Sequence, residues 1–342
     1  AKGFPTTKLE EWRFTNVSPF LKEDFRLQPG AASLHKLHNV VHIPSLDAYE
    51  VVLKNGMLNE DVNIPGVKIL PLRTALKNDD LKPYLGKRIN LQKHPFAALN
   101  TALFENGIVI EAEKNSVCDK PIHITHVYNA EEAVFIQPRI LIIAHRGSKI
   151  QIVESVVVIG NKPLFVNSVT ECYVAENAQA DQYNLQIAPS NAHLVNFNKT
   201  VQQSNSLYNN HTYILPDASL VRNNLHLDLN GSNTESHLYG LYLAGTSQLA
   251  DNHTTVNHLF PNCLSNELYK GVMLDSARCV FSGRIFVDQD AQKTNAFQQN
   301  NNMLLSDTAV IDSKPQLEIF ADDVKCSHGS TVGSLNKEAL FY

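Results

Sequence analysis

A short phrase recurs through the central part of the chain, and it constrains the fold more than any other feature. Each copy places an Asp, Glu or Gly near a small residue and continues with residues of high β propensity. Three of the four intervals between copies span about thirty to forty residues. The copies are Gly147-Ser148-Lys149-Ile150, Glu176-Asn177-Ala178-Gln179-Ala180, Asp217-Ala218-Ser219-Leu220, Asp275-Ser276-Ala277-Arg278 and Asp307-Thr308-Ala309-Val310.

A repeat of this length is typical of a solenoid, because each turn buries its apolar face only against its neighbours. Residues 98–320 also show alternating Val, Ile, Leu and Tyr runs and hardly any stretch with helical periodicity. A β-sandwich is the competing architecture, but it expects turns about every 8–12 residues and leaves the recurring phrase unexplained. The sequence therefore predicts a mainly β chain with a parallel β-helix over 98–320.

Residues 1–97 have a mixed character and are predicted to form a small α/β region. One helix is predicted after Thr6-Thr7, because Glu10 and Glu11 would lie in its first turn. A second helix is predicted over 73–85 from the spacing of its Leu and Ala residues. Short strands are predicted over 40–43 and 48–53, with a turn at Asn55-Gly56.

Composition argues against several classes of partner. Lys and Arg number 29 against 34 Asp and Glu, and no basic run is present, so a nucleic-acid partner is not expected. The longest apolar stretches, such as 140–144 and 156–159, are far shorter than the roughly 20 residues that span a bilayer, so no membrane segment is expected. The N-terminal residues show no secretory signal pattern. Five scattered cysteines without a Cys-x-x-Cys pair favour a reducing, cytoplasmic environment.

Residues 317–333 contain the densest group of reactive side chains. Cys326 and His328 are two positions apart, so on an extended strand they lie on the same face and can share a metal or a bridging sulfur. The alternative is a strand-to-turn transition in which Asp322 and Asp323 solvate the turn and Cys326 belongs to the core. Two candidate ligands alone do not complete a site that normally needs three or four.

Other polar groups favour structural roles. Asp322 and Asp323 are adjacent, so on a strand they face opposite sides and do not flank one bond as a general acid–base pair. The pairs His123/His126 and His253/His258 lack the spacing of zinc hydrolases and are interpreted as hydrogen-bonded surface histidines. Residues 298–302 are expected to form an amide ladder along the solenoid. No phosphate-binding loop or dinucleotide fingerprint is present.

Several segments resemble a known family. The stretch after His258 and above all Asp322-Asp323-Val324-Lys325-Cys326-Ser327-His328-Gly329 closely resemble the C-terminal half of SufD, in the SufB/SufD family of iron–sulfur cluster assembly scaffolds. Residues 3–15, which read Gly-Phe-Pro-Thr-Thr-Lys-Leu-Glu-Glu-Trp-Arg-Phe-Thr, resemble the N-terminal motif of the same family. The two regions lie near the two ends of the chain. Between them, residues 31–252 are similar to the family in general character more than in individual residues.

Two positions favour the SufD branch over the SufB branch. SufB carries its cluster-assembly cysteine just before the Met-Leu pair that corresponds to Met303-Leu304, where this chain has Asn300. SufB also has a Glu directly after the histidine that corresponds to His328, where this chain has Gly329.

The resemblance implies a right-handed parallel β-helix between an N-terminal domain and a C-terminal helical domain that docks the SufC ATPase. Residues 321–342 would be the truncated beginning of that helical domain. It also implies a non-catalytic subunit of a SufBCD complex that pairs with a SufB-like subunit, and forms homodimers when isolated, while ATP is hydrolysed by the SufC-like subunit.

The resemblance further implies that His328, with Cys326, lies at the interface with the SufB-like subunit as a ligand. An iron–sulfur cluster or iron would be held there transiently, with no cofactor bound stably by the isolated chain. The rival interpretation is a β-helix carbohydrate lyase or hydrolase, which fold alone does not exclude. It would need an aromatic-lined cleft, yet the single tryptophan, Trp12, lies outside the predicted β region.

Overall fold

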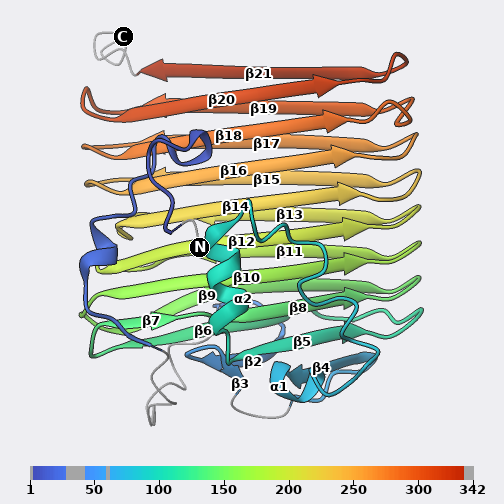
Figure 1. Cartoon of the computed structure of the whole chain (residues 1–342), viewed down its shortest axis with the longest axis horizontal. Helices are drawn as coiled ribbons and strands as arrows, with labels where there is room; N and C mark the ends of the chain where they lie inside the picture. The colour runs from blue at the N-terminus through green and yellow to red at the C-terminus, as the bar shows by residue number, and fades with distance from the viewer. Residues whose placement is uncertain (1–2, 28–42, 59–61, 335–342) are drawn as a thin grey trace.

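The structure of the chain is a computed structural model that describes residues 3–27, 43–58 and 62–334. Its strands stack in parallel into a β-solenoid of about eight turns, in which successive strands alternate between two sheets (Figure 1). The predicted parallel β-helix is therefore confirmed.

Each turn of the solenoid contributes one strand to each sheet. The first sheet contains, in spatial order, β20 (Val310–Ile319), β18 (Arg278–Val287), β16 (Leu249–His258), β14 (Leu220–Leu229), β12 (Ala192–Gln202), β10 (Leu164–Val174), β8 (Arg139–Ala144), β5 (Gly107–Ala112) and β4 (Val67–Pro71). In the same sheet β7 (Val134–Ile136) pairs with β10, and β1 (Arg26–Leu27) pairs with β7. The second sheet contains β21 (Lys325–Ser334), β19 (Asn295–Leu304), β17 (Leu264–Met273), β15 (Glu235–Ala244), β13 (Leu207–Ile214), β11 (Gln179–Gln186), β9 (Lys149–Gly160), β6 (Ile122–Ala130), β2 (Tyr49–Lys54) and β3 (Met57–Leu58).

The recurring sequence phrase forms the corners of the solenoid. At four of the five copies one residue adopts a left-handed backbone conformation, which Gly, Asn and Asp tolerate best. The φ angles are 70°, 59°, 109° and 52° at Gly147, Asn177, Asp217 and Asp275. The small residue that follows is buried against the adjacent turns, as at Ser148, Ala178, Ala218 and Ala277. A larger side chain at this position would collide with the neighbouring corner.

The strands stay in register from turn to turn. Paired residues from β5 onwards lie 27 to 32 positions apart, the extremes being His193 with Leu220 and Arg278 with Val310. The repeat is thus shorter than the predicted thirty to forty residues. The spacing between copies of the phrase overestimates the length of a turn, because some copies precede strands of one sheet and others precede strands of the other.

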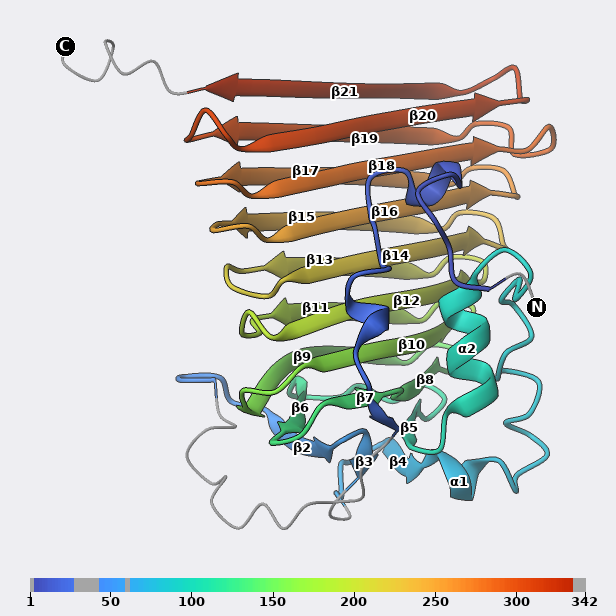
Figure 2. The ribbon, with the colours of Figure 1, turned by 60° about the vertical axis from the view of Figure 1, so that its left-hand side comes forward.

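The N-terminal segment and one helix cover the outer face of the first sheet (Figure 2). The segment contains two 3₁₀ turns, Glu10–Trp12 and Phe20–Lys22, and the helix is α2 (Pro95–Leu103). Trp12 and Phe96 pack with Phe165 of β10 in one buried apolar cluster. This cover explains why some outward-facing residues of the first sheet, such as Phe135, Phe165 and Val195, are apolar and buried.

The helix predicted over 73–85 is wrong. Only α1 (Leu72–Ala75) is helical, and a series of turns follows. The side chain of Asn78 accepts a hydrogen bond of 3.0 Å from the backbone N–H of Asp80, which competes with continuation of the helix. Pro83 lies further along the same segment.

Other local predictions have mixed outcomes. The helix predicted after Thr7 is a single 3₁₀ turn, and α2 was not predicted although Pro95 stands at its first position, where proline is favoured. The strand predicted over 48–53 corresponds to β2, and Asn55 and Gly56 make the turn to β3 with φ angles of 48° and 81°. In the strand predicted over 40–43, residues 40–42 lie outside the described residues.

The solenoid strands continue past residue 320. β21 pairs with β19 along its whole length, so the described part of the predicted C-terminal helical region, up to residue 334, contains a strand and no helix. At the start of the solenoid, β2 pairs in parallel with β6, so strands from the predicted N-terminal region also join the sheets.

Candidate functional site

The two ends of the solenoid differ. At the N-terminal end, β3 and β4 are the last strands of the two sheets and pair in antiparallel orientation with β2 and β5. At the C-terminal end, β20 pairs with β18 and β21 with β19, and within the described residues no further strand pairs with either (Figures 1 and 2). Each strand thus presents a free row of backbone N–H and C=O groups, which is a template for another strand.

Cys326 and His328 both lie on β21. They are placed on the same face of the strand, as their spacing predicted. Cys326 is partly buried against the hydrophobic core, and burial raises the pKa of its thiol. His328 is exposed. The thiol is therefore protonated at neutral pH in the isolated chain, which disfavours metal binding through sulfur alone.

Neighbouring acids do not complete a metal site. Asp322 and Asp323 are exposed in the turn before β21, and the backbone N–H of Asp323 donates to the Gln292 side chain over 2.9 Å. Across the described ranges, no group of three or more His, Cys, Asp or Glu side chains is placed to hold a metal ion. A metal at Cys326 and His328 would need ligands from outside these residues.

The amide run of β19 is divided between two faces of the strand. Gln298, Asn300 and Asn302 point inward and are buried, while Gln299 and Asn301 point outward. The predicted amide ladder is wrong, because the register partners of all five residues on the adjacent turns are other residue types. Strand alternation instead directs three of the amides into the interior, where they join a network that crosses several turns.

That network surrounds a buried tyrosine. The hydroxyl of Tyr242 donates to Asn302 Oδ1 over 2.5 Å and accepts from Asn300 Nδ2 over 2.8 Å. Ser313 donates to Asn300 over 2.8 Å, and Ser330 of β21 donates to Ser313 over 2.9 Å. Hydrogen bonds thus connect the buried network to the last strand.

Glu267 of β17 is a buried carboxyl group in the same part of the interior. It is 1% exposed and accepts hydrogen bonds from Thr254 Oγ1 over 2.6 Å and from Gln298 Nε2 over 3.2 Å. Burial raises its pKa to about 7, because these two hydrogen bonds only partly offset the loss of hydration.

Replacing Glu267 by Gln is expected to remove a pH dependence of folding. Because the native pKa lies above the ordinary value of 4.5, the native chain holds this proton more tightly, and stability falls as pH rises through about 7. The wild type should lose roughly 3 kcal/mol from this group between pH 5 and pH 8, and the variant should not. Urea unfolding at both pH values checks this. The same pH dependence in both proteins would contradict the assignment.

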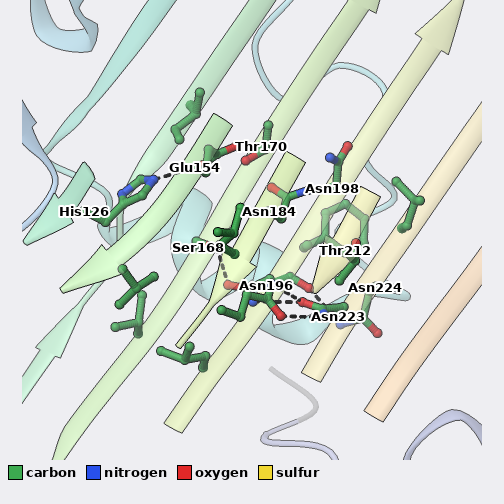
Figure 3. A pocket seen from close by; sticks show the side chains of 18 of the residues that line it. His126, Glu154, Ser168, Thr170, Asn184, Asn196, Asn198, Thr212, Asn223 and Asn224 are labelled. Carbon is green, nitrogen blue, oxygen red and sulfur yellow. Dashed lines mark hydrogen bonds and ion pairs between the residues drawn. The ribbon is translucent and has the colours of Figure 1, made fainter. Parts of the chain in front are cut away.

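A separate cavity of about 90 Å³, lined by both polar and apolar side chains, lies between the sheets in the middle of the solenoid. Figure 3 shows the His126–Glu154 pair on one side of it, at 2.9 Å, and amide side chains on the other. Asn223 joins the amide group through a bond of 2.9 Å from Asn196 Nδ2. The cavity is large enough for several water molecules, and water beside its polar residues would also satisfy the unpartnered Nδ1 of His126.

The interpretation of four histidines as surface residues is wrong. His123 and His258 are fully buried, His126 is 5% exposed, and the side chain of His253 is 15% exposed. His258 Nε2 lies 2.8 Å from Ser265 Oγ, and burial lowers its pKa to about 3, so it is neutral. Polar residues fill much of this interior, so a histidine in a strand does not indicate that the position is exposed at the surface.

Fold and site define a parallel β-solenoid protein that ends in antiparallel strands at one end and in two parallel strands with free edges at the other. Comparison with known proteins gives the family. Residues 126–342 match the SufBD core domain of the SUF system for FeS cluster assembly, and residues 1–124 match the SufBD protein N-terminal region. The chain belongs to the SufB/SufD family.

The similar relatives span almost all of the chain. An iron–sulfur cluster assembly SufBD family protein of Synechocystis sp. is 30% identical over 99% of this chain and 78% of its own length. Iron–sulfur cluster assembly protein SufD of Escherichia coli is 29% identical over 99% of this chain and 79% of its own. SufD of Bacillus subtilis is 24% identical over 98% and 79%. Within the described residues, no helix is long and apolar enough to cross a bilayer.

Proposed function

We propose that this chain is a SufD-like scaffold subunit of a SufBCD-type complex and that it pairs with a SufB-like subunit through the free edges of β20 and β21. The free edge of β21 carries the proposal, because an unpaired strand at the end of a regular stack is suited to continue the stack into a second solenoid. The SufD names of two relatives support the choice of branch.

The proposal assigns no catalysis to this chain. A SufC-like ATPase would hydrolyse ATP, and the isolated chain would form homodimers through the same edges. The five cysteines are all free thiols, which supports a reducing, cytoplasmic location.

His328 is proposed as the interface residue that meets iron or a nascent cluster. It is exposed on the edge strand, and imidazole is a competent ligand for iron. Cys326 lies on the same face and would be a second ligand if the pairing strand moved it out of its partly buried position. Iron or a cluster would be cargo, held only while the partner supplies the remaining ligands.

Replacing Val332 by Pro is expected to weaken pairing at least tenfold. Lys325 N–H donates to Thr294 O of the β19 side over 2.8 Å. Because alternate residues of a parallel strand bond to opposite neighbours, Val332 directs its backbone groups to the free edge. Proline there removes an edge donor without removing a bond to β19. Sedimentation of the chain, alone and mixed with the SufB-like subunit, measures the effect.

Val332→Ala is the matched control, because it shortens the side chain, which is 54% exposed, and keeps the backbone N–H. It should pair nearly as the wild type does. Equal pairing by the Pro and Ala variants would contradict edge pairing at β21, as would a purely monomeric wild type in both experiments.

A further inference from the structure

The buried Glu267 lacks a counter-charge in the described structure. Its two hydrogen-bond donors, Thr254 and Gln298, are both neutral. Its register neighbour on β15 is Leu238, and the titratable group beside it on its own strand is Tyr269, whose pKa is itself raised by burial and by Glu267. A buried carboxyl without a cation is costly to the fold, so stability alone does not explain it.

Glu267 fixes the orientation of the Gln298 amide. A carboxylate only accepts hydrogen bonds, so the Nε2 side of the amide must face it. The Oε1 side then points away, and this oxygen is buried without a hydrogen-bond partner. Buried acceptors are rarely left unpaired, so this one calls for a donor.

Gly283 of β18 makes room for this arrangement. A Cβ atom there would lie 2.2 Å from Gln298 Nε2 and 2.7 Å from its Cδ. Any larger residue at position 283 would displace the amide. The interior is thus shaped around one position of the Gln298 side chain.

Gln298, which carries the unpartnered oxygen, lies one turn below His328. Glu267, Gln298 and His328 are register partners on β17, β19 and β21, so their side chains project to the same side on three consecutive turns. Adjacent strands are about 4.8 Å apart, which is within reach of an imidazole N–H on the next turn. Of the register partners of Gln298, which are Glu267 and His328, only His328 has a ring N–H that can donate.

We propose that Gln298 and Glu267 are positioning residues for His328: Gln298 Oε1 accepts the N–H of one ring nitrogen while the other nitrogen binds iron or a cluster, and Glu267 holds the amide in that orientation. The inference rests on the proposed role of His328. A metal-binding histidine generally donates its second N–H to a fixed acceptor, and this bond sets the tautomer and the ring orientation.

The charge state of Glu267 then selects the tautomer of His328. A protonated Glu267 can donate to Gln298 Oε1, which turns the amide and presents its NH₂ group to His328. The ring nitrogen facing the interior would then accept, and the proton would sit on the nitrogen that must bind the metal. The raised pKa of Glu267 supports this coupling because it brings the change close to neutral pH.

The test uses the full chain co-purified with its SufB-like and SufC-like partners. Gln298→Met removes the acceptor at similar volume, and Glu267→Gln removes the carboxylate with little change of shape. Both should lower iron retention about tenfold while the complex still forms. Gln299→Met is the matched control, since it is the adjacent, exposed residue on the opposite face of β19. It should retain iron as the wild type does.

A second measurement reads His328 directly. With ¹⁵N-labelled histidine in this chain only, ring nitrogen shifts should report one tautomer of His328 in the wild-type complex and a mixture in Gln298→Met. If His328→Ala loses iron but Gln298→Met and Glu267→Gln keep it with a single tautomer, the positioning role is wrong and the role of His328 stands. If His328→Ala itself keeps its iron, the proposed function fails first.

Discussion

Replacing Arg222 by Met is expected to lower the free energy of unfolding by about 3–5 kcal/mol, because it leaves a buried carboxylate without its partner. Arg222 of β14 is 1% exposed, forms an ion pair with Asp251, and donates to the backbone oxygen of Glu11 over 2.7 Å. The ring of Trp12 lies 3.8 Å from its guanidinium carbon. One cation thus attaches the N-terminal segment to the solenoid, and urea unfolding measures its contribution.

Asp251 shows how strongly this pair is coupled. Burial alone would raise its pKa, but the charge of Arg222, with contributions from His253 and Thr15, lowers it to about 2. Because the native pKa is below the ordinary value of 3.8, the stability from this carboxylate is present above that pH and is lost as pH falls towards 2. The double variant Arg222→Met with Asp251→Asn removes both charges and should recover much of the loss. Equal stability of the single and double variants would contradict a buried ion pair.

Replacing His328 by Ala is expected to abolish most iron retention by the complex while the fold is kept. The side chain is exposed on an edge strand, so its loss should cost no more than about 1 kcal/mol. A lost ligand, in contrast, leaves the metal with an incomplete shell. Iron and acid-labile sulfide in the purified complex, together with urea unfolding of the isolated chain, separate the two effects.

Cys326→Ser is the informative comparison. The thiol is partly buried and its pKa is raised, so as a core residue it should affect stability slightly and iron retention little. A loss of iron equal to that of His328→Ala would make it a second ligand. Normal iron and sulfide in His328→Ala would remove the proposed site.

Local signals made the solenoid predictable. Four of the five corners formed by the phrase need a residue in the left-handed conformation and then a small buried residue, as at Asn177-Ala178. Few other conformations require this combination of residue types, so the sequence reveals it. The helices at the edges of the fold were harder to predict from the sequence. The segment after Leu72 has helical spacing, but the Asn78 side chain binds the backbone N–H of Asp80 and favours a turn there. The helix α2 is short and is held by packing against the sheet.

The shared face of Cys326 and His328 followed from strand alternation alone. The interior partners proposed for His328, Gln298 and Glu267, could not be predicted in this way, because both faces of these strands mix polar and apolar residues. On β17, Glu267 points inward and Leu268 outward, the reverse of what hydrophobicity suggests. The alignment of Glu267, Gln298 and His328 depends on the register between strands about thirty residues apart. A single sequence does not reveal that register.

Co-expression of the tagged chain with SufB-like and SufC-like subunits tests the central claim most directly. If the chain is a scaffold subunit that extends its solenoid through β20 and β21, purification through the tag should recover both partners in fixed proportion, and Val332→Pro should release the SufB-like subunit. Recovery of the wild-type chain without either partner, at protein concentrations in the micromolar range, would contradict it.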